Sequence, residues 1–563
     1  MSSRRRVIFP FILILIAFAV ITARLFLLQV WFHEDLNKRA EKIYCKVLPE
    51  LPCRGMILDR NGKTLAMSVK TYQLFLDFKS IKDIADVKSV LRTNGITLTE
   101  KQIRDNANSS YLVIADNVGI ETAKSIRGCS LAGVGFTPKY VRTYPEGKMA
   151  SHILGVVGKE GSGLEGIEYT ANSYLAGGSV RGIGFRDGRG RSVSAKLSNP
   201  NDSRGSNVYL TIDRNIQFIA EQEIEQAWKK SRSKKAIAIV QDPETGEILA
   251  MAIRPNYDPA NFAGSDLRNP AVSDVFEPGS TFKAITSAAA LEQNLVKRKE
   301  LIWCENGAYK VYNHTIKDHE KKGLITFDQI MECSSNVGLA KVGQRLGKEN
   351  LYNYAKQFGF YSPTGIDLPG EAKGLLKDPA KWSGLSLPVI SFGQEVGVTA
   401  IQMINAYSAM ANGGELLEPR IVEQVRNSSG NTLYQAEKRI IRKAVSPKIA
   451  AELRDILRGV VDRGTGQLAG VQGYTIGGKT GTAQKRDKRT GKYSTSCYVA
   501  SFCGIAPVNN PKLTIFVVLD EPQGDYYAAS QAAPIFRKIA SRTLQYLRIQ
   551  PDNEPMKLAG KLK

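Results

Sequence analysis

The chain has 563 residues, which at about 150 residues per domain predicts three or four folding units. Hydrophobic residues make up 43% and charged residues 23%, and the 50 glycines and 23 prolines follow no period, so collagen, low-complexity and wholly disordered chains are excluded. The net charge of +23 favours an anionic neighbour such as a membrane surface, a cell-wall polymer or nucleic acid. Nucleic acid ranks last, because no zinc finger or RNA-binding aromatic motif occurs and the basic residues are spread along the chain.

A membrane anchor is predicted at the N-terminus. Three consecutive arginines, residues 4–6, precede an uncharged apolar run over 7–23, which extends further if Arg24 reaches the interface. The arginine cluster favours an N-terminus in the cytoplasm with the rest of the chain outside it. We therefore expect a single-pass protein of the cytoplasmic membrane with a short tail over 1–6 and an anchor over 7–30.

A cleaved signal peptide is the alternative interpretation of this segment. Ala17, Phe18 and Ala19 have the small-x-small form of a cleavage site. That triplet lies inside the apolar run rather than after it, and the run is long for a signal peptide, so the anchor is favoured.

The seven cysteines indicate neither a zinc site nor a full disulfide framework, because their count is odd and no C-x-x-C pair occurs. Cys45 with Cys53, or Cys497 with Cys503, could form a bridge in an oxidising exterior. Buried free thiols are an equally good interpretation.

Beyond the anchor, the composition and the hydrophobic pattern divide the chain into two regions. The first stretch is rich in glycine and turn signals and contains short alternating segments such as 71–78, which predicts an elongated β-rich module over 31–205. A second domain is expected over 206–548, followed by a basic tail over 549–563.

The pattern of the second domain predicts an α+β fold. Strands at both of its ends with a mostly helical stretch over 280–412 between them imply one antiparallel sheet with helices packed against it. Helical spacing predicts helices at 216–229 and 531–547, and apolar runs predict strands at 236–240, 248–253, 493–505 and 513–519.

Ser280 and Lys283 form an S-x-x-K motif at the start of an apolar segment. Pro278 and Gly279 break the preceding chain, and the alanine-rich residues 281–293 predict a buried helix. Free backbone N–H groups at that helix end can stabilise an oxyanion, and apolar surroundings disfavour the charged form of Lys283, which we expect within hydrogen-bond range of Ser280. A partly neutral lysine can take the serine proton, although an isolated S-x-x-K is more often an N-cap serine and an ordinary lysine.

Two further segments strengthen this hypothesis. Ser334 and Asn336 can project from one short turn between two helical segments, and Lys479 begins a Lys-Thr-Gly triplet after two glycines. Ser-x-x-Lys, Ser-x-Asn and Lys-Thr-Gly in this order are the motif set of the penicillin-recognising serine acyl-enzymes.

Two other mechanisms have weaker support. The chain has four histidines and no G-x-S-x-G motif, which argues against a Ser-His-Asp triad, and His314 and His319 are expected to be surface or packing residues. Residues 473–480 match a phosphate-binding loop, but no strong strand precedes them and a glycine follows at once, so this match is treated as accidental.

Over nearly its whole length the sequence resembles the class B, high-molecular-weight penicillin-binding proteins, and among them the division-associated, FtsI-like transpeptidases. Residues 268–279 resemble the septal subgroup more than the elongation subgroup, which stays the alternative. Glu395 stands where relatives usually have glycine. Outside the three motifs, the resemblance is carried by residues 54–62, 142–145 with His152 and Gly155, 163–168, 210–213, 245–251, 391–394 and 398–399.

The resemblance implies a membrane-anchored D,D-transpeptidase that cross-links peptidoglycan, with a dimerisation-type pedestal and a transpeptidase domain whose five-stranded antiparallel sheet carries helices on both faces. Ser280 would attack the carbonyl between the two terminal D-alanines of a stem peptide and form an acyl-enzyme, with Lys283 as the base. Ser334 and Asn336 would relay protons and hold the substrate amide, with Lys479 supporting the same network.

Substrate binding is also implied by the resemblance. Thr480 and Thr482 would bind the terminal carboxylate, with Gly481 letting the strand edge come close, and the N–H groups of Ser280 and Thr482 would form the oxyanion hole. No metal or cofactor is required. The implied partners are peptidoglycan stem peptides, β-lactam antibiotics that acylate Ser280, a membrane glycosyltransferase of the FtsW or RodA type and other division proteins.

Several alternatives stay open at this point. Arg54, Asp59 and Arg142 of the pedestal either help to dock the glycosyltransferase or form salt bridges within a loop-rich module. A β-lactamase would need a group that activates water, a β-lactam sensor would need a cytoplasmic signalling part where about six residues precede the span, and a non-catalytic scaffold would be expected to lack a motif residue.

Overall fold

The computed structural model describes residues 3–36, 45–50, 53–106, 111–177, 180–186, 192–196, 204–486 and 490–553. The chain forms two compact units. The first combines Met1–Cys53, Lys70–Val141 and Gly177–Gly205, and the second combines Arg54–Val69, Arg142–Ala176 and Ser206–Lys563. The domain boundaries expected from the sequence texture stay a prediction.

The first unit begins with an apolar helix. Helix α1 (Ser3–Phe26) continues into the short π-helical segment η1 (Leu27–Trp31). Residues Ile8–Trp31 have a mean hydropathy of 2.8 and none of them is buried in the protein. At about 1.5 Å per residue these 24 residues span roughly 36 Å, enough to cross the hydrocarbon core. The helix therefore fits the predicted membrane anchor.

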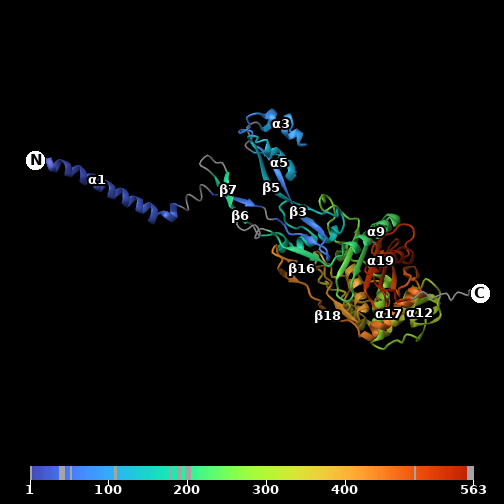
Figure 1. The fold of residues 1–563 in the computed structure, drawn as a ribbon. Helices are drawn as coiled ribbons and strands as arrows, with labels where there is room; N and C mark the ends of the chain where they lie inside the picture. The colour runs from blue at the N-terminus through green and yellow to red at the C-terminus, as the bar shows by residue number, and fades with distance from the viewer. Residues whose placement is uncertain are drawn as a thin grey trace, which may run out of the picture. The chain divides into compact units, whose positions relative to one another are not determined.

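The rest of the first unit is rich in strands, as its turn signals and alternating segments predict. The alternating segment 71–78 lies mostly in β3, where Leu74 and Leu76 pack against Val87 and Leu91 of α3. Its elements are β1 (Cys45–Glu50), β6 (Val180–Arg186), β7 (Ser192–Lys196), the second part of β3 (Thr64–Leu76), β4 (Leu112–Val118), β5 (Val134–Thr143), α3 (Ile84–Thr93), α4 (Glu100–Asn106) and α5 (Ile120–Gly128) (Figure 1).

The second unit brings together strands that are distant in the sequence. Its smaller part contains β2 (Ile57–Leu58), the first part of β3, α6 (Ser151–Leu154), α7 (Gly166–Thr170) and α8 (Asn172–Leu175). There β2 pairs in parallel with β8 (Asn207–Leu210), which pairs with β16 (Val422–Arg426), which in turn pairs with β17 (Thr432–Gln435).

A buried ion cluster holds this part together. The Glu168 carboxylate has no solvent exposure and accepts from Arg54 Nε at 2.5 Å and from Arg142 Nε at 2.6 Å. Arg54 also donates to the Glu168 backbone oxygen, and Arg142 donates to Gly55 O at 2.7 Å. Asp59 accepts from the backbone N–H groups of residues 61, 63 and 214. These contacts support the salt-bridge interpretation for Arg54 and Arg142, whereas Asp59 holds the adjoining loops through backbone hydrogen bonds.

Replacing Glu168 with alanine should destabilise the second unit strongly. Two buried guanidinium groups would lose their counter-charge, and breaking a buried pair in this way costs about 3–5 kcal/mol. Thermal unfolding of the detergent-solubilised chain would measure the loss. Glu349→Ala is the control, since Glu349 is 65% exposed beside Lys348. Equal unfolding midpoints for the two variants would contradict a stabilising role for the cluster.

The larger part of the second unit is built on a five-stranded antiparallel sheet with the order β10-β9-β21-β20-β19. Its strands are β9 (Lys235–Gln241), β10 (Ile248–Arg254), β19 (Gly477–Arg486), β20 (Tyr493–Ala506) and β21 (Leu513–Asp520). The predicted strands and the predicted α+β layout are therefore confirmed, with the two ends of the domain meeting in one sheet.

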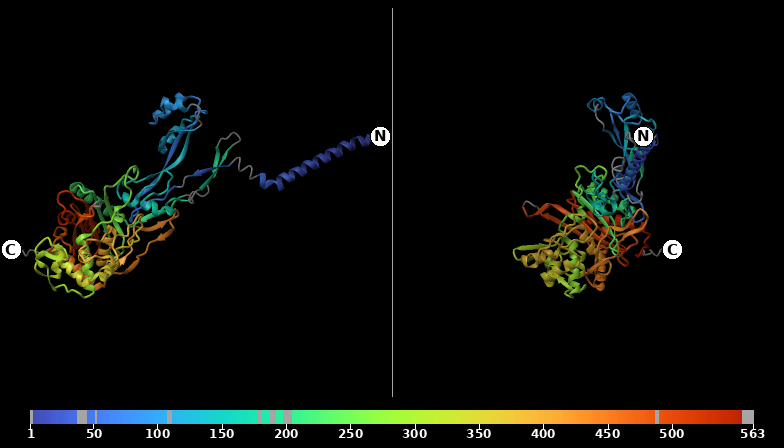
Figure 2. Two further views of the ribbon diagram at one scale, coloured as in Figure 1. Left: turned by 180° about the vertical axis from the view of Figure 1, so that it is seen from behind. Right: turned by 90° about the vertical axis from the view of Figure 1, so that its left-hand side faces the viewer.

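Helices cover both faces of this sheet, because its strands are apolar on both sides. Ala236, Ala238 and Val240 face α9 (Arg214–Ser231) and α19 (Ala533–Tyr546), which lie side by side (Figure 1). Ile237 and Ile239 point to the other face, toward α11 (Lys283–Glu292), α16 (Ala400–Ala411) and α17 (Pro447–Asp462). Seen from behind, the red C-terminal helix lies again beside the green α9 (Figure 2).

The stretch between β10 and β15 is less helical than predicted. Four short strands form two antiparallel ribbons within it, and runs of three or four residues are too short to show a clear period. The remaining elements are α10 (Pro270–Ser273), η2 (Gly279–Phe282), β11 (Leu301–Trp303), η3 (Glu305–Gly307), β12 (Ala308–Val311), β13 (His314–Lys317), β14 (Leu324–Thr326), α12 (Phe327–Glu332), α13 (Asn336–Leu346), α14 (Lys348–Gln357), η4 (Pro379–Lys381), α15 (Ser386–Ile390), β15 (Glu415–Leu417), β18 (Ile440–Lys443), η5 (Gln467–Ala469) and α18 (Ala528–Gln531).

Of the two cysteine pairings left open by the sequence, Cys497 with Cys503 is not formed, and both thiols are free. Both residues lie in β20, six positions apart, and an extended strand separates such residues by roughly 20 Å. The pairing of Cys45 with Cys53 falls on a side chain outside the described residues.

Candidate active site

Ser280 lies where the sequence predicts it, at the start of a buried helix. It belongs to the 3₁₀ turn η2, which continues directly into α11, and Gly279 before it has a φ of +54°, a backbone conformation that favours glycine. The side chain is half-buried and lines a pocket of about 630 Å³.

The strand β19 runs close to this turn because Gly481 has no side chain. A Cβ atom at Gly481 would lie 2.9 Å from Pro278 O and 2.9 Å from the Thr281 methyl carbon. The space that Gly481 leaves is therefore filled by the turn that carries Ser280. The glycine brings the Lys-Thr-Gly strand to the serine.

Lys283 has no solvent exposure and is held by the turn after α12. Its Nζ donates to Ser334 O at 2.6 Å, to Ser334 Oγ at 3.2 Å and to Asn336 Oδ1 at 2.7 Å. Burial lowers its pKa to about 7, while the Asp318 carboxylate acts in the opposite direction. Among the described residues, no hydrogen bond joins Ser280 directly to Lys283. The predicted contact between these two side chains therefore stays a prediction.

The turn that holds Lys283 has an unusual backbone. Ser334 adopts a φ of +60°, which costs a residue with a side chain about 1–3 kcal/mol and is typical of functional sites. Ser335 then caps α13 by accepting from Gly338 N at 2.9 Å, and Asn336 is the first residue of that helix. As predicted, Ser334 and Asn336 project from one short connection between helices.

Asp318 fixes this connection, and the sequence analysis did not identify it. Its carboxylate accepts from Ser335 Oγ at 2.6 Å, from Asn336 N at 2.5 Å and from Val337 N at 3.0 Å. Negative charge at a helix N-terminus is favourable, so Asp318 anchors α13 and places a carboxylate near Lys283. It lies in a loop rich in charge, where no spacing distinguishes it from its neighbours.

Lys479 is a second lysine with no solvent exposure. Burial and the nearby Lys283 both lower its pKa well below the usual value. Its Nζ lies 3.3 Å from Thr480 Oγ1. Because β19 contains Lys479 and continues past Thr480 to Arg486, where a phosphate-binding loop would pass into a helix, the match at 473–480 is accidental, as predicted.

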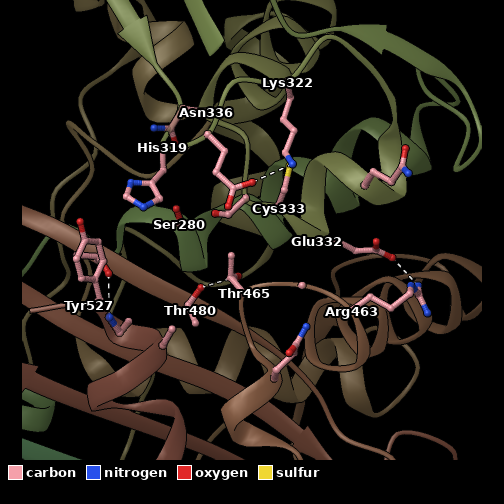
Figure 3. A pocket seen from close by; sticks show the side chains of 18 of the residues that line it. Ser280, His319, Lys322, Glu332, Cys333, Asn336, Arg463, Thr465, Thr480 and Tyr527 are labelled. Carbon is pink, nitrogen blue, oxygen red and sulfur yellow. Dashed lines mark hydrogen bonds and ion pairs between the residues drawn. The ribbon is translucent and has the colours of Figure 1, made fainter. Parts of the chain in front are cut away.

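The three motifs meet at one pocket. Five of the predicted site residues line it, namely Ser280, Ser334, Asn336, Thr480 and Thr482 (Figure 3). The two lysines lie behind this wall rather than in it. The site therefore combines the partly exposed hydroxyl of Ser280 with the Lys283 amine, whose pKa is about 7. Ser334 lies between that amine and the pocket, and Thr480 and Thr482 add two hydroxyls.

Aromatic side chains form one edge of the same pocket. His319, which the sequence analysis assigned to surface or packing, lines it together with Tyr527, and their ring centroids lie 5.6 Å apart. Tyr526 stacks on Tyr527 and also on Tyr498. Nothing in the sequence pattern points to this group, because its members come from separate loops and strands.

Comparison with known proteins agrees with this geometry. Residues 236–541 match the family described as "Penicillin binding protein transpeptidase domain", and residues 49–210 match the "Penicillin-binding Protein dimerisation domain". The chain therefore belongs to the penicillin-binding protein transpeptidases. The family and the enzyme class predicted from the three motifs and the wider resemblance are confirmed, as is the predicted fold.

Particular relatives cover nearly the whole chain. Stage V sporulation protein D of Bacillus subtilis is 34% identical over 568 residues, which cover 98% of this chain and 87% of the relative. The peptidoglycan D,D-transpeptidase FtsI of Escherichia coli K12 is 30% identical, covering 96% of this chain and 91% of the relative. Penicillin-binding protein 3 of Mycobacterium tuberculosis, solved in complex with aztreonam, is 30% identical with a TM-score of 0.71, covering 91% of this chain and 98% of that one.

Proposed function

We propose that this chain is a serine D,D-transpeptidase that cross-links peptidoglycan stem peptides during septal wall synthesis and is acylated by β-lactams. The observation that carries the proposal is the junction of the three motifs at one pocket, with the Lys283 amine buried and bonded to Ser334 and Asn336.

Acylation uses Ser280 as the nucleophile. Its hydroxyl oxygen attacks the carbonyl carbon between the two terminal D-alanines, and its proton passes to the Lys283 amine, which burial keeps partly neutral. Ser334 bonds to Lys283 and lines the pocket, so it can pass the proton on to the departing amine. The peptide bond breaks, D-alanine leaves, and the rest of the stem peptide stays on Ser280 as an ester.

Transfer completes the cycle. The amine of a neighbouring stem peptide attacks the ester, its proton returns through the same groups to the Ser280 oxygen, and a new peptide bond forms. The N–H groups of Ser280 in η2 and of Thr482 in β19 stabilise the oxyanion in both steps. A β-lactam forms the same ester, and the enzyme is inhibited because no amine then resolves it.

The terminal carboxylate of the substrate binds at Thr480 and Thr482. Both residues line the pocket, and the Lys479 amine behind them holds the Thr480 hydroxyl in place by a hydrogen bond. Asn336 holds the substrate amide, since its Oδ1 and Nδ2 are fixed by Lys283 and by Lys317 O.

The apolar N-terminal helix anchors the enzyme in the cytoplasmic membrane, with the N-terminus inside and the chain that follows the helix outside. The septal role follows the FtsI names of two relatives and the subgroup resemblance of residues 268–279. A membrane glycosyltransferase of the FtsW type supplies the glycan strands that this enzyme cross-links. An elongation role with a RodA-type partner is the second candidate.

A penicillin with a fluorescent group tests the proposal on the native chain. We expect one adduct per chain, on the tryptic peptide that contains Ser280, with a lifetime of minutes, and release of D-alanine from a D-Ala-D-Ala peptide that increases when an acceptor amine is added. Release of the label within seconds would indicate a β-lactamase, and the absence of an adduct would indicate a scaffold. Loss of septa upon depletion, rather than loss of rod shape, distinguishes the two cellular roles.

A further inference from the structure

A residue outside the three motifs contacts the proposed carboxylate site. Thr465 lies in the loop between α17 and η5, lines the same pocket, and has its Oγ1 3.0 Å from the Oγ1 of Thr480. Figure 3 shows the two hydroxyls directed toward each other beside Ser280. No motif of the sequence analysis includes this loop.

The loop is fixed by the end of α12. Thr465 N donates to Glu332 O at 3.1 Å, and Arg463 forms an ion pair with the Glu332 carboxylate. A Cβ atom at Gly464 would lie 2.3 Å from Glu332 O, so only glycine allows this approach. Three adjacent residues are thus held against the helix that leads to Ser334, which gives Thr465 a defined position.

The hydrogen-bonding capacity of Thr480 gives this contact a direction. A threonine hydroxyl has one proton to donate and two lone pairs that accept. Lys479 Nζ donates to Thr480 Oγ1 at 3.3 Å and takes one lone pair. If Thr465 donates to the other, both lone pairs are occupied and the Thr480 proton is free to point into the pocket that its side chain lines.

We propose that Thr465 is a positioning residue for carboxylate recognition: its hydroxyl donates to Thr480 and so directs the Thr480 proton toward the substrate carboxylate. The inference rests on the proposed function, because it assigns Thr480 to carboxylate binding. It adds a fourth segment to the site and concerns binding of the anion, while the acyl transfer itself stays with Ser280 and Lys283.

Thr465→Val removes the hydroxyl at nearly constant size, and Thr465→Ser keeps it. The probes are benzylpenicillin, which carries a carboxylate, and its methyl ester, which does not. A hydrogen bond to a charged group is stronger than one between neutral groups, so Thr465→Val should lower the second-order acylation rate of the acid roughly tenfold or more. Its rate with the ester should stay within about twofold of native, and Thr465→Ser should restore the rate with the acid.

The comparison of acid and ester separates positioning from a structural role. If Thr465→Val slows both probes equally, or slows neither, the inference is overturned. Thr465→Ala repeats the measurement with a smaller side chain, and Gln467→Ala, in the same wall of the pocket, should leave the ratio of the two rates at the native value. Failure of the proposed function would look different, since the native chain would then be acylated by neither probe.

Discussion

Replacing Ser280 with alanine should abolish covalent labelling by penicillin and the release of D-alanine from a D-Ala-D-Ala peptide. The pocket keeps its other lining groups, so ligands should still bind reversibly while no ester forms. Removing a catalytic serine from an acyl-transfer site costs about 10⁴-fold or more in rate, because the remaining groups only bind and polarise. Mass spectrometry of the intact chain after incubation with a β-lactam measures the adduct directly.

Ser287→Ala is the matched control for this experiment. Ser287 lies two helical turns further along the same segment, is buried, and contacts the Met331 sulfur rather than the pocket. Its variant should be labelled like the native chain. Persistent labelling of Ser280→Ala, for instance at Ser334, would show that the nucleophile has been assigned to the wrong hydroxyl.

Replacing Lys283 with methionine should lower the acylation rate about 10³-fold, within the range that general-base catalysis contributes. Methionine fills the buried space without an amine, so the Ser280 proton has no acceptor at that position. The second-order rate constant of acylation by benzylpenicillin measures the change.

The pH profile of the native chain tests the same assignment. The neutral amine is the base, and its fraction rises with pH until the pKa of about 7 is passed. The acylation rate should therefore increase roughly tenfold per pH unit below neutrality and become level above it. Lys283→Arg keeps the positive charge and cannot be deprotonated in this range, so it should be as slow as the methionine variant. An arginine variant within threefold of native would exclude Lys283 as the base.

Much of the site could be predicted from the sequence because its motifs are local. Ser280 and Lys283 lie at the start of one helical segment, Ser334 and Asn336 lie in one turn, and Lys479 lies near the start of one strand. Short spacing in the sequence therefore constrains the relative positions of the side chains within each group. The sheet was equally accessible, since its strands are continuous apolar runs buried on both faces.

What the sequence could not reveal depends on contacts between distant segments. Asp318 and Thr465 reach the site from loops, and their roles arise only when Ser335 and Thr480 are brought beside them by the fold. The hydrogen bonds of Lys283 to Ser334 and Asn336 depend likewise on how α11 and α13 pack. Spacing within a segment carries no information about these distances.

The two solvent-free lysines imply a conflict between heat tolerance and reactivity. Each amine is removed from water and, among the described residues, has no carboxylate bonded to it, so burying it costs free energy that the rest of the fold must offset. Natural proteins commonly retain destabilising groups of this kind where activity requires them. Selection for thermal stability alone would favour replacement of these two lysines. The same replacement would remove the catalytic groups of the enzyme.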